Sequence, residues 1–327
     1  IKVVIKAEDY SGNTSRDTFT FYYDKTAPTG LKATLDGTTY LERDTGTFFK
    51  IAPSVTLEAK DSGVGVGNYI LDGSKKRDGQ YKLSDGTHTV SVEDLLGNKA
   101  GDANLASLLG WKSNRVVVDG TAPEISASKP SGGVNNWYKS DQSYPVKITD
   151  NVAVQSATIT INGKEVDKFE SPGRDVSNVT LTGNTNRVSA NNDGSYNVVV
   201  SVTDKAGNKS EWKDTIYIDK TKPTVDKFVF SGAKISNGAN IGGSGRYGFF
   251  FEGSGSVSIY ASDGTVSSGV KEVVVTLNNK NGGTTTRTVA VKGGVAEVSI
   301  PTNFKGTISA HAVDNVGNEG SEERPDG

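Results

Sequence analysis

Aspartate is the residue of this chain that combines reactive chemistry with regular spacing. An Asp-x-x-Gly-Asn turn occurs four times, with starts 85, 110 and 110 residues apart, at Asp9, Asp94, Asp204 and Asp314. A second set opens Asp-x-Thr-x-Pro segments, at Asp24, Asp119 and Asp219. A third set ends alternating apolar segments, at Asp61, Asp150 and Asp263. Carboxylates at such positions either accept backbone N–H bonds within tight turns or bind a hard cation.

The segments before these turns predict β-strands. Apolar and polar residues alternate in "VVIKAED", "HTVSVED", "NVVVSVTD" and "ISAHAVD", as in half-buried strands. A second strand pattern follows three of the turns, in "DTFTFYYD", "NRVVVD" and "DTIYID". We therefore expect each of these turns to join the two strands of a hairpin, with Gly supplying a positive φ. The Pro that closes each linker cannot donate to a ladder and ends the pairing.

The repeat length predicts the fold class. Units of about 95–110 residues with short strands and turn signals every 8–12 residues are typical of immunoglobulin-like β-sandwiches. We expect an all-β chain of tandem immunoglobulin-like modules in a linear array. The predicted modules are 28–120, 121–221 and 222–327, and residues 1–27 form the last hairpin of a preceding module.

The two ends of the chain carry an expectation and an open question. Residue 1 is Ile and no signal peptide precedes it, so we expect a piece of a longer protein. No closing strand pattern follows the last turn, in "EGSEERPDG". Two interpretations stay open: a cut through a longer array, or strand exchange in which one molecule's hairpin completes another's open edge.

Composition narrows the class of function. The net charge is −2, so no basic field favours a nucleic-acid partner. No apolar run reaches about 18 residues, so we expect no membrane span in this segment. The chain has no Cys and no Met, which excludes disulfides and thiolate chemistry and suits an extracellular protein.

Sandwich topology predicts where the aspartates meet. The loops after the second and the sixth strand lie at one pole of such a fold, and the linker from the previous module arrives there. We therefore expect three groups of carboxylates, one at each junction: Asp24, Asp61 and Asp94; Asp119, Asp150 and Asp204; Asp219, Asp263 and Asp314.

Two interpretations of these groups stay open. Three carboxylates within a few ångströms repel one another, and Ca²⁺ binds 6–8 oxygen ligands at irregular loops. Alternatively, Asp at the first position of a tight turn bonds backbone N–H groups and needs no metal. A Lys partner for the linker Asp explains less, because Gly120 stands at that position in the middle linker.

Aromatic residues and one insertion are the candidates for ligand contact. Phe49, Tyr138 and Phe251 each stand twelve residues before an aspartate of the third set. This fixed offset favours a buried plug at the start of an inner strand over a ligand-stacking platform. The interval from turn Asn to linker Asp is 21 residues in the first module and 11 in the second. The insertion carries apolar residues at helical spacing, a candidate binding flap or a piece folded onto its own module: Leu105, Leu108, Leu109 and Trp111.

Catalysis is not predicted. The two histidines, His88 and His311, fall in different modules, next to or within strand patterns. A two-His zinc site is therefore excluded within one module, and no nucleophile-elbow motif is present. Every carboxylate that stands out belongs to the repeat, and a feature carried by every module is more often structural.

The combination of strand, "D-x-x-G-N", strand and "D-K-T-A-P", with "D-S-G-V" earlier in the unit, resembles the tandem bacterial immunoglobulin-like (Big) domains of large extracellular surface and adhesin proteins. The resemblance covers essentially the whole chain. It implies a stalk or spacer on the bacterial surface or in a secreted protein, whose partners are adjacent modules of the same chain. The giant calcium-stiffened adhesins of Gram-negative bacteria are similar, and their junction aspartates correspond to those named above.

Two other functions fit the same resemblance. One is an adhesin module that binds a host or surface glycan or protein, through the insertion or the aromatics near 246–251. The other is an accessory module of a large secreted glycoside hydrolase or of an S-layer protein.

Overall fold

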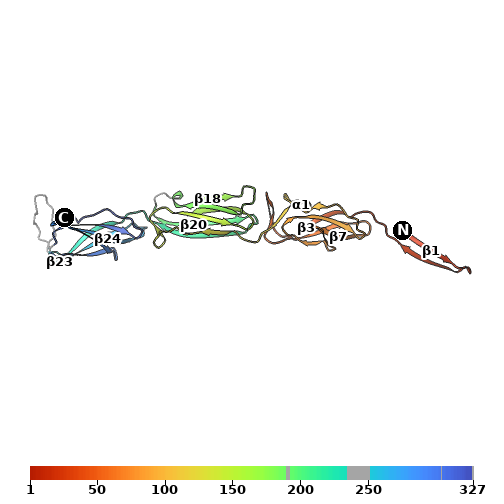
Figure 1. Cartoon of the computed structure of the whole chain (residues 1–327), viewed down its shortest axis with the longest axis horizontal. Helices are drawn as coiled ribbons and strands as arrows, with labels where there is room; N and C mark the ends of the chain where they lie inside the picture. The colour runs from red at the N-terminus through yellow and green to blue at the C-terminus, as the bar shows by residue number, and fades with distance from the viewer. Residues whose placement is uncertain (189–191, 234–250, 303, 326–327) are drawn as a thin grey trace.

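The protein is a row of β-sandwiches. The computed structural model describes residues 1–188, 192–233, 251–302 and 304–325. Three immunoglobulin-like sandwiches follow one another along the long axis, and an N-terminal hairpin projects at one end (Figure 1). The predicted fold class is thus confirmed. No helix in the described part of the chain is long and apolar enough to cross a membrane.

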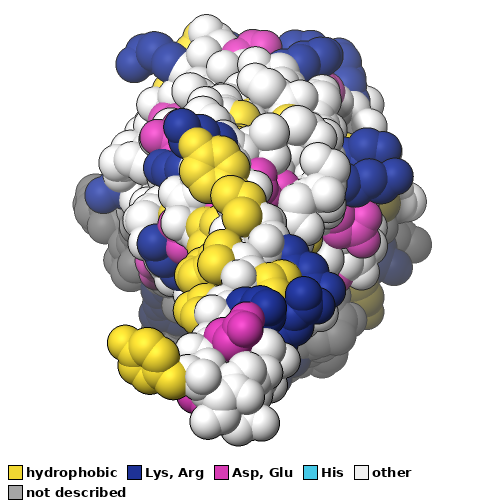
Figure 2. All heavy atoms as spheres, turned by 90° about the vertical axis from the view of Figure 1, so that its right-hand side faces the viewer, with side chains coloured by type: hydrophobic (Ala, Val, Ile, Leu, Met, Phe, Trp, Pro, Cys, Tyr) yellow, Lys and Arg dark blue, Asp and Glu magenta, His cyan; other side chains and the backbone are white. Residues whose placement is uncertain are grey.

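The N-terminal hairpin stands apart from the sandwiches. Strands β1 (Lys2–Glu8) and β2 (Thr14–Thr20) pair around the Asp9 turn. Cross-strand partners Val3 and Phe19 lie on the same face of the ribbon, and both are at least 40% exposed. Figure 2, which faces this end of the molecule, shows hydrophobic side chains gathered in a row. The hairpin has the alternation of a sandwich strand pair, and no second sheet covers it among the described residues.

In the first sandwich, the two strand patterns around the Asp94 turn do not form the predicted hairpin. Its sheets comprise β3 (Thr29–Leu35), β6 (Ser54–Lys60) and β9 (Gln80–Lys82); β12 (Ala103–Asn104), β11 (Thr89–Asp94), β7 (Val66–Leu71) and β8 (Ser74–Lys76); and β10 (Gly86–Thr87), β13 (Arg115–Val118), β5 (Gly46–Phe49) and β4 (Tyr40–Arg43). The turn at Asp94 does not join β11 to β13, because β12 of the insertion lies beside β11. Strand β13 pairs instead with β10 and β5.

The insertion packs on its own sandwich. Helix α1 (Leu105–Leu109) begins at Asn104, whose side chain accepts the Ala106 N–H, and ends at Gly110 with a φ of 74°. Leu105 is 1% exposed and Trp111 8%, and the Trp111 ring lies 5.7 Å from Phe49 between centroids. Leu108 and Leu109 are partly buried against the same core. This burial favours the folded insertion over a binding flap.

The second and third sandwiches follow the predicted alternation. The second contains β14 (Glu124–Ala127), β16 (Ser143–Thr149) and β19 (Asn178–Asn184), facing β15 (Trp137–Tyr138), β21 (Lys209–Ile218), β20 (Gly194–Asp204), β17 (Val154–Ile161) and β18 (Lys164–Glu170). The third contains β22 (Thr224–Ala233), β23 (Phe251–Ser262) and β26 (Val295–Ile300), facing β25 (Thr284–Ala290), β24 (Val270–Asn279) and β27 (Gly306–Asp314). Every second residue of β16 is fully buried, namely Tyr144, Val146 and Ile148, so alternation sets the core.

The repeated aromatics hold the linkers. Phe49 and Tyr138 are buried, but each ends a short separate strand, β5 or β15, instead of starting β6 or β16. These short strands run parallel to the last strand of their sandwich, β13 or β21. The carbonyl of Phe49 accepts the Asp119 N–H at 2.8 Å, and that of Tyr138 accepts the Asp219 N–H at 2.9 Å. Phe251 begins β23, and the interpretation of residues 246–251 as ligand contacts lies outside the described residues and side chains.

We expect Leu105→Ala to destabilise the first sandwich by about 2–5 kcal/mol, because it leaves a cavity in a closed core. The matched control is Leu96→Ala, since Leu96 is 57% exposed and its truncation should change stability by less than about 0.5 kcal/mol. Urea unfolding of the full chain measures both. Equal effects of the two substitutions would show that the insertion does not pack as described.

Candidate metal centres at the junctions between sandwiches

Three groups of three aspartates converge as the topology predicts. In each group, one carboxylate oxygen per residue lies within 4.8 Å of the others, and the groups are Asp24, Asp61 and Asp94; Asp119, Asp150 and Asp204; Asp219, Asp263 and Asp314. The linker supplies the first aspartate of each group. The second aspartate follows β6, β16 or β23, and the third ends β11, β20 or β27. The approach is close, since a Cβ at Gly63 would lie 1.8 Å from Asp24 Oδ2.

Turn chemistry accounts for part of this arrangement. Asp204 Oδ1 accepts the Asn208 N–H at 2.8 Å, and its Oδ2 accepts the Asn208 amide at 2.8 Å. Asp9, which belongs to none of the three groups, makes the same two bonds to Asn13. The turn therefore forms without any second carboxylate. The other aspartates accept local N–H bonds as well: Asp61 Oδ2 accepts from Gly63 and Gly65 at 2.9 and 2.7 Å. Local bonds thus account for each aspartate singly, and the convergence of three carboxylates is a separate feature.

The turn asparagine also holds the linker, a role that sequence reasoning missed. Asn98, Asn208 and Asn318 donate a side-chain N–H to the backbone carbonyl of Asp24, Asp119 and Asp219, at 3.0, 2.8 and 2.9 Å. Each amide thus bonds its own turn and the arriving linker together. The signal available in the sequence was that Asn ends every copy of the turn.

A buried polar atom without a hydrogen-bond partner lies in or beside each group. These atoms are Asp61 Oδ1 in the first group, Asp150 Oδ2 in the second, and Ser268 Oγ beside the third. The other oxygen of Asp150 accepts the Val152 N–H at 2.9 Å. The Ser268 N–H donates to Asp219 Oδ2 at 2.7 Å. Buried oxygens are normally bonded, so a cation ligand role fits these atoms.

Electrostatics distinguish the groups. Burial raises the pKa of Asp204 and Asp314 in spite of bonds from their turn asparagines, and neighbouring carboxylates raise it further. Burial, with a neighbouring carboxylate, also raises the pKa of Asp150 and Asp263. In the first group the Thr26 hydroxyl lowers the pKa of Asp24. The second and third groups therefore gain most from a positive charge.

The donor set fits Ca²⁺. Oxygens at 2.3–2.6 Å from one ion lie within about 5 Å of one another, and the three carboxylate oxygens of each group are near enough, within 4.8 Å, to share an ion. Carboxylates, backbone carbonyls and solvent are the ligands that Ca²⁺ prefers. The nine aspartates are the residues that would hold the ion, and its positive charge would neutralise theirs.

The remaining candidates show no catalytic arrangement in the described chain. His88 Nδ1 lies 2.6 Å from Asp72 Oδ2, and Nε2 lies 2.9 Å from the Ser84 carbonyl oxygen. His311 pairs with Val274 within a ladder.

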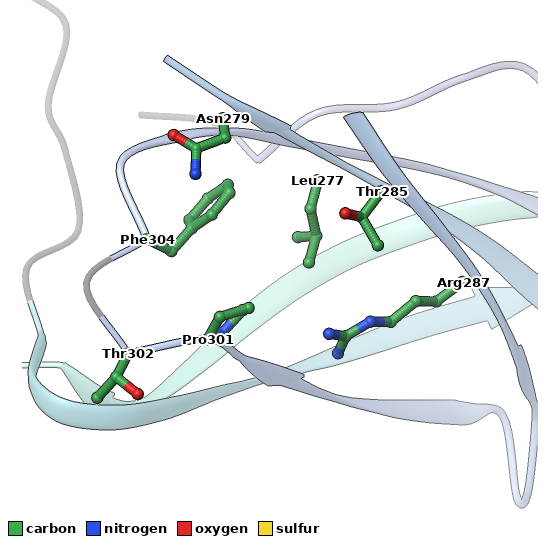
Figure 3. Close-up of a pocket in the computed structure, with 7 residues that line it drawn as sticks. All are labelled: Leu277, Asn279, Thr285, Arg287, Pro301, Thr302 and Phe304. Carbon is green, nitrogen blue, oxygen red and sulfur yellow. The ribbon is translucent and has the colours of Figure 1, made fainter. Parts of the chain in front are cut away.

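A pocket of about 120 Å³ at the far end of the third sandwich is drawn in Figure 3. Arg287 is the single charged residue in its lining, and its Nη1 donates to the Ser299 carbonyl.

We expect Asn318→Ala to loosen the junction between the second and third sandwiches with or without Ca²⁺. The substitution removes the amide bonds to the Asp219 carbonyl and to Asp314 Oδ2 from a side chain that is 5% exposed. Loss of such buried bonds costs about 1–3 kcal/mol. Urea unfolding measures it, with Asn13→Ala as the matched control at a turn that has no linker. Equal small losses would contradict the linker role of Asn318.

Comparison with known proteins returned solved structures only; no family model and no curated protein matches the chain. One similar structure is a tetra-tandem repeat in the extending region of a large adhesion protein (19% identity, 99% of this chain, 81% of that chain, TM-score 0.33). Another is a Ca²⁺-stabilized adhesin with which an Antarctic bacterium binds ice (16% identity, 99% of this chain, 80% of that chain, TM-score 0.32). A third is a 1.5-MDa bacterial ice-binding adhesin (15% identity, 91% of this chain, 96% of that chain, TM-score 0.32). At these low similarities, we take function from this chain's own residues.

Proposed function

We propose that this chain is a spacer segment of a bacterial cell-surface or secreted protein and that calcium stiffens its junctions. The modules are 28–120, 121–221 and 222–327, with 1–27 as the last hairpin of a further module. The segment works outside the cell, without catalysis, by holding a functional region at a distance. Its partners are the adjacent modules of the same chain.

One observation carries the proposal. At every junction, carboxylates from three separate segments converge, and one of the three comes from the linker. A cation held by all three joins the linker to two loops of the following sandwich. A linker fixed at its own carboxylate and at its backbone carbonyl has little freedom to swing. The junction then transmits orientation from one sandwich to the next.

The energies expected are modest, and the benefit is mechanical. Extracellular calcium modules have dissociation constants of about 10⁻⁴–10⁻³ M. With free calcium a few times above that constant, mass action adds about 1 kcal/mol per site. An affinity in this range is matched to calcium outside cells, so the segment stiffens where a stalk is needed.

We expect calcium to raise the melting temperature by about 4–8 °C per kcal/mol of stabilisation for a sandwich of this size. Small-angle scattering of the full chain should show a longer and stiffer particle in millimolar calcium than in excess EGTA. Isothermal titration should fit three sites, one per group. Identical melting and scattering curves in the two buffers would overturn the proposal.

Asp150→Asn should act in opposite directions in the two buffers. Asn preserves the acceptor for the Val152 N–H but removes a charge whose burial is unfavourable. In EGTA the variant should therefore melt at or above the wild-type temperature. In calcium it should lose the gain at the second junction and bind one ion fewer. Asp9→Asn is the control, since Asp9 lies outside the groups and its change should not alter calcium binding.

A further inference from the structure

The second sandwich has a loop that its neighbours lack. Residues 171–177 join β18 to β19, while the corresponding connections are residues 77–79 in the first sandwich and 291–294 in the third. The loop is held in shape by its own bonds, since Ser171 Oγ donates to the Arg174 carbonyl at 3.1 Å. Gly173 has a φ of 75°, and a Cβ there would lie 3.3 Å from Asp44 Oδ2 of the first sandwich. The loop therefore reaches across the junction.

Asp175, in this loop, connects the two sandwiches. Its Oδ1 accepts from Thr45 Oγ1 at 2.7 Å and from Lys205 Nζ at 2.8 Å, and its Oδ2 accepts from Arg115 Nη1 at 2.7 Å. Thr45 and Arg115 belong to the first sandwich. Although burial opposes ionisation, the bonds from Lys205, Thr45 and Arg115 hold the pKa of Asp175 at about 2. The carboxylate is thus charged and fully engaged at neutral pH.

Lys205 completes the network from the turn of the second sandwich. Its side chain is 2% exposed, and its Nζ donates to Thr45 Oγ1 at 2.8 Å and to the Arg174 carbonyl at 3.0 Å as well as to Asp175. All three ammonium hydrogens therefore have acceptors. Its backbone carbonyl accepts from Arg43 Nε at 3.3 Å. A lysine this buried needs such complete pairing. The second sandwich supplies two of the acceptors, the Arg174 carbonyl and Asp175, and Thr45 of the first sandwich supplies the third.

An apolar contact lies beneath the polar network. Ala206 of the turn packs against Phe48 and Val117 of the first sandwich, and the three are buried to 3% exposure or less. Lys205 Nζ lies 6.0 Å from the centre of the Phe48 ring. This contact involves none of the nine aspartates. The junction therefore combines a hydrophobic contact with a charged network.

The other junctions have a different residue at the position of Lys205. In the third sandwich it is Asn315, whose side chain donates to Ser268 and Gly269 of its own sandwich. In the first sandwich it is Leu95, which is 53% exposed. The junction of the second and third sandwiches has the asparagine bond, the bond from the Ser268 N–H to Asp219 Oδ2, and a bond from Lys139 Nζ to the Gly317 carbonyl.

We propose that the loop 171–177 and Lys205 form a clasp that fixes the first and second sandwiches as one rigid unit with or without a bound cation. Bending on removal of calcium is then confined to the junction before the first sandwich and the junction before the third. The contrast between junctions rests on the proposed calcium stiffening, whereas the clasp itself does not.

The test measures the flexibility of each junction separately in the full chain. Because the chain has no Cys, spin labels attach only at introduced cysteines on exposed strand residues. The pair Lys32→Cys and Lys147→Cys spans the clasped junction, and the pair Lys147→Cys and Glu297→Cys spans the next one. Double electron–electron resonance then gives each distance distribution in excess EGTA and in millimolar calcium.

In EGTA we expect a narrow distribution across the clasped junction and one at least twice as broad across the next, with both narrow in calcium. Asp175→Ala should broaden the first pair in EGTA. A second variant replaces residues 171–177 by the Arg-Asp-Gly connection of the first sandwich and should do the same, because it removes the whole loop that reaches the first sandwich. Glu165→Gln, on the same sandwich but away from the junction, should change neither distribution.

Two results would overturn the clasp: a broad first distribution in wild-type chain in EGTA, or narrow distributions in both clasp variants in EGTA. Circular dichroism and melting of the variants establish that the sandwiches remain folded. The proposed function fails separately, if calcium does not narrow the distribution across the second and third sandwiches. The clasp is judged from the EGTA measurements alone, so the two failures are distinguishable.

Discussion

The geometry of every junction depends on one asparagine amide. Its two hydrogens bond the carboxylate of its own turn and the backbone carbonyl of the linker, as Asn208 bonds Asp204 and Asp119. This fixes the linker against the turn and brings its carboxylate beside two others. The local bonds are favourable, but their result is a concentration of negative charge that burial makes more costly. The proposed cation site thus follows from a stabilising contact, not from a dedicated binding loop.

Two kinds of junction result from one repeat. Where the turn carries Asn315, the side chain at that position bonds back to its own sandwich. Where it carries Lys205, the same position enters a network that crosses the junction. A single residue in a repeated turn therefore separates a junction that depends on carboxylates and the linker from one with additional direct contacts. If the proposed clasp fixes its junction, variation at this position and in the loop 171–177 would adjust stiffness along an array without changing the fold.

Periodic features were predictable from the sequence, and irregular ones were not. The alternation in β16 and the intervals between aspartates are local patterns that repeat, so the sandwiches and the three groups of carboxylates followed from them. The predicted pairing of β13 with β11 was wrong, because the ten inserted residues place β12 beside β11. The contact of Asp175 with Arg115 joins residues 60 apart in different sandwiches. Such a contact depends on how folded units meet, which no residue spacing encodes.

The parallel pairing of β5 with β13 and of β15 with β21 determines how the chain bears tension. Each pair joins a strand near the start of a sandwich to its last strand. A pull applied along the array draws the two strands past each other lengthwise, so their hydrogen bonds are loaded together and not broken one by one. Resistance to stretching then resides in these short ladders. Phe49 and Tyr138 also place the next linker at the end of the same ladder, so force passes directly from one sandwich to the next.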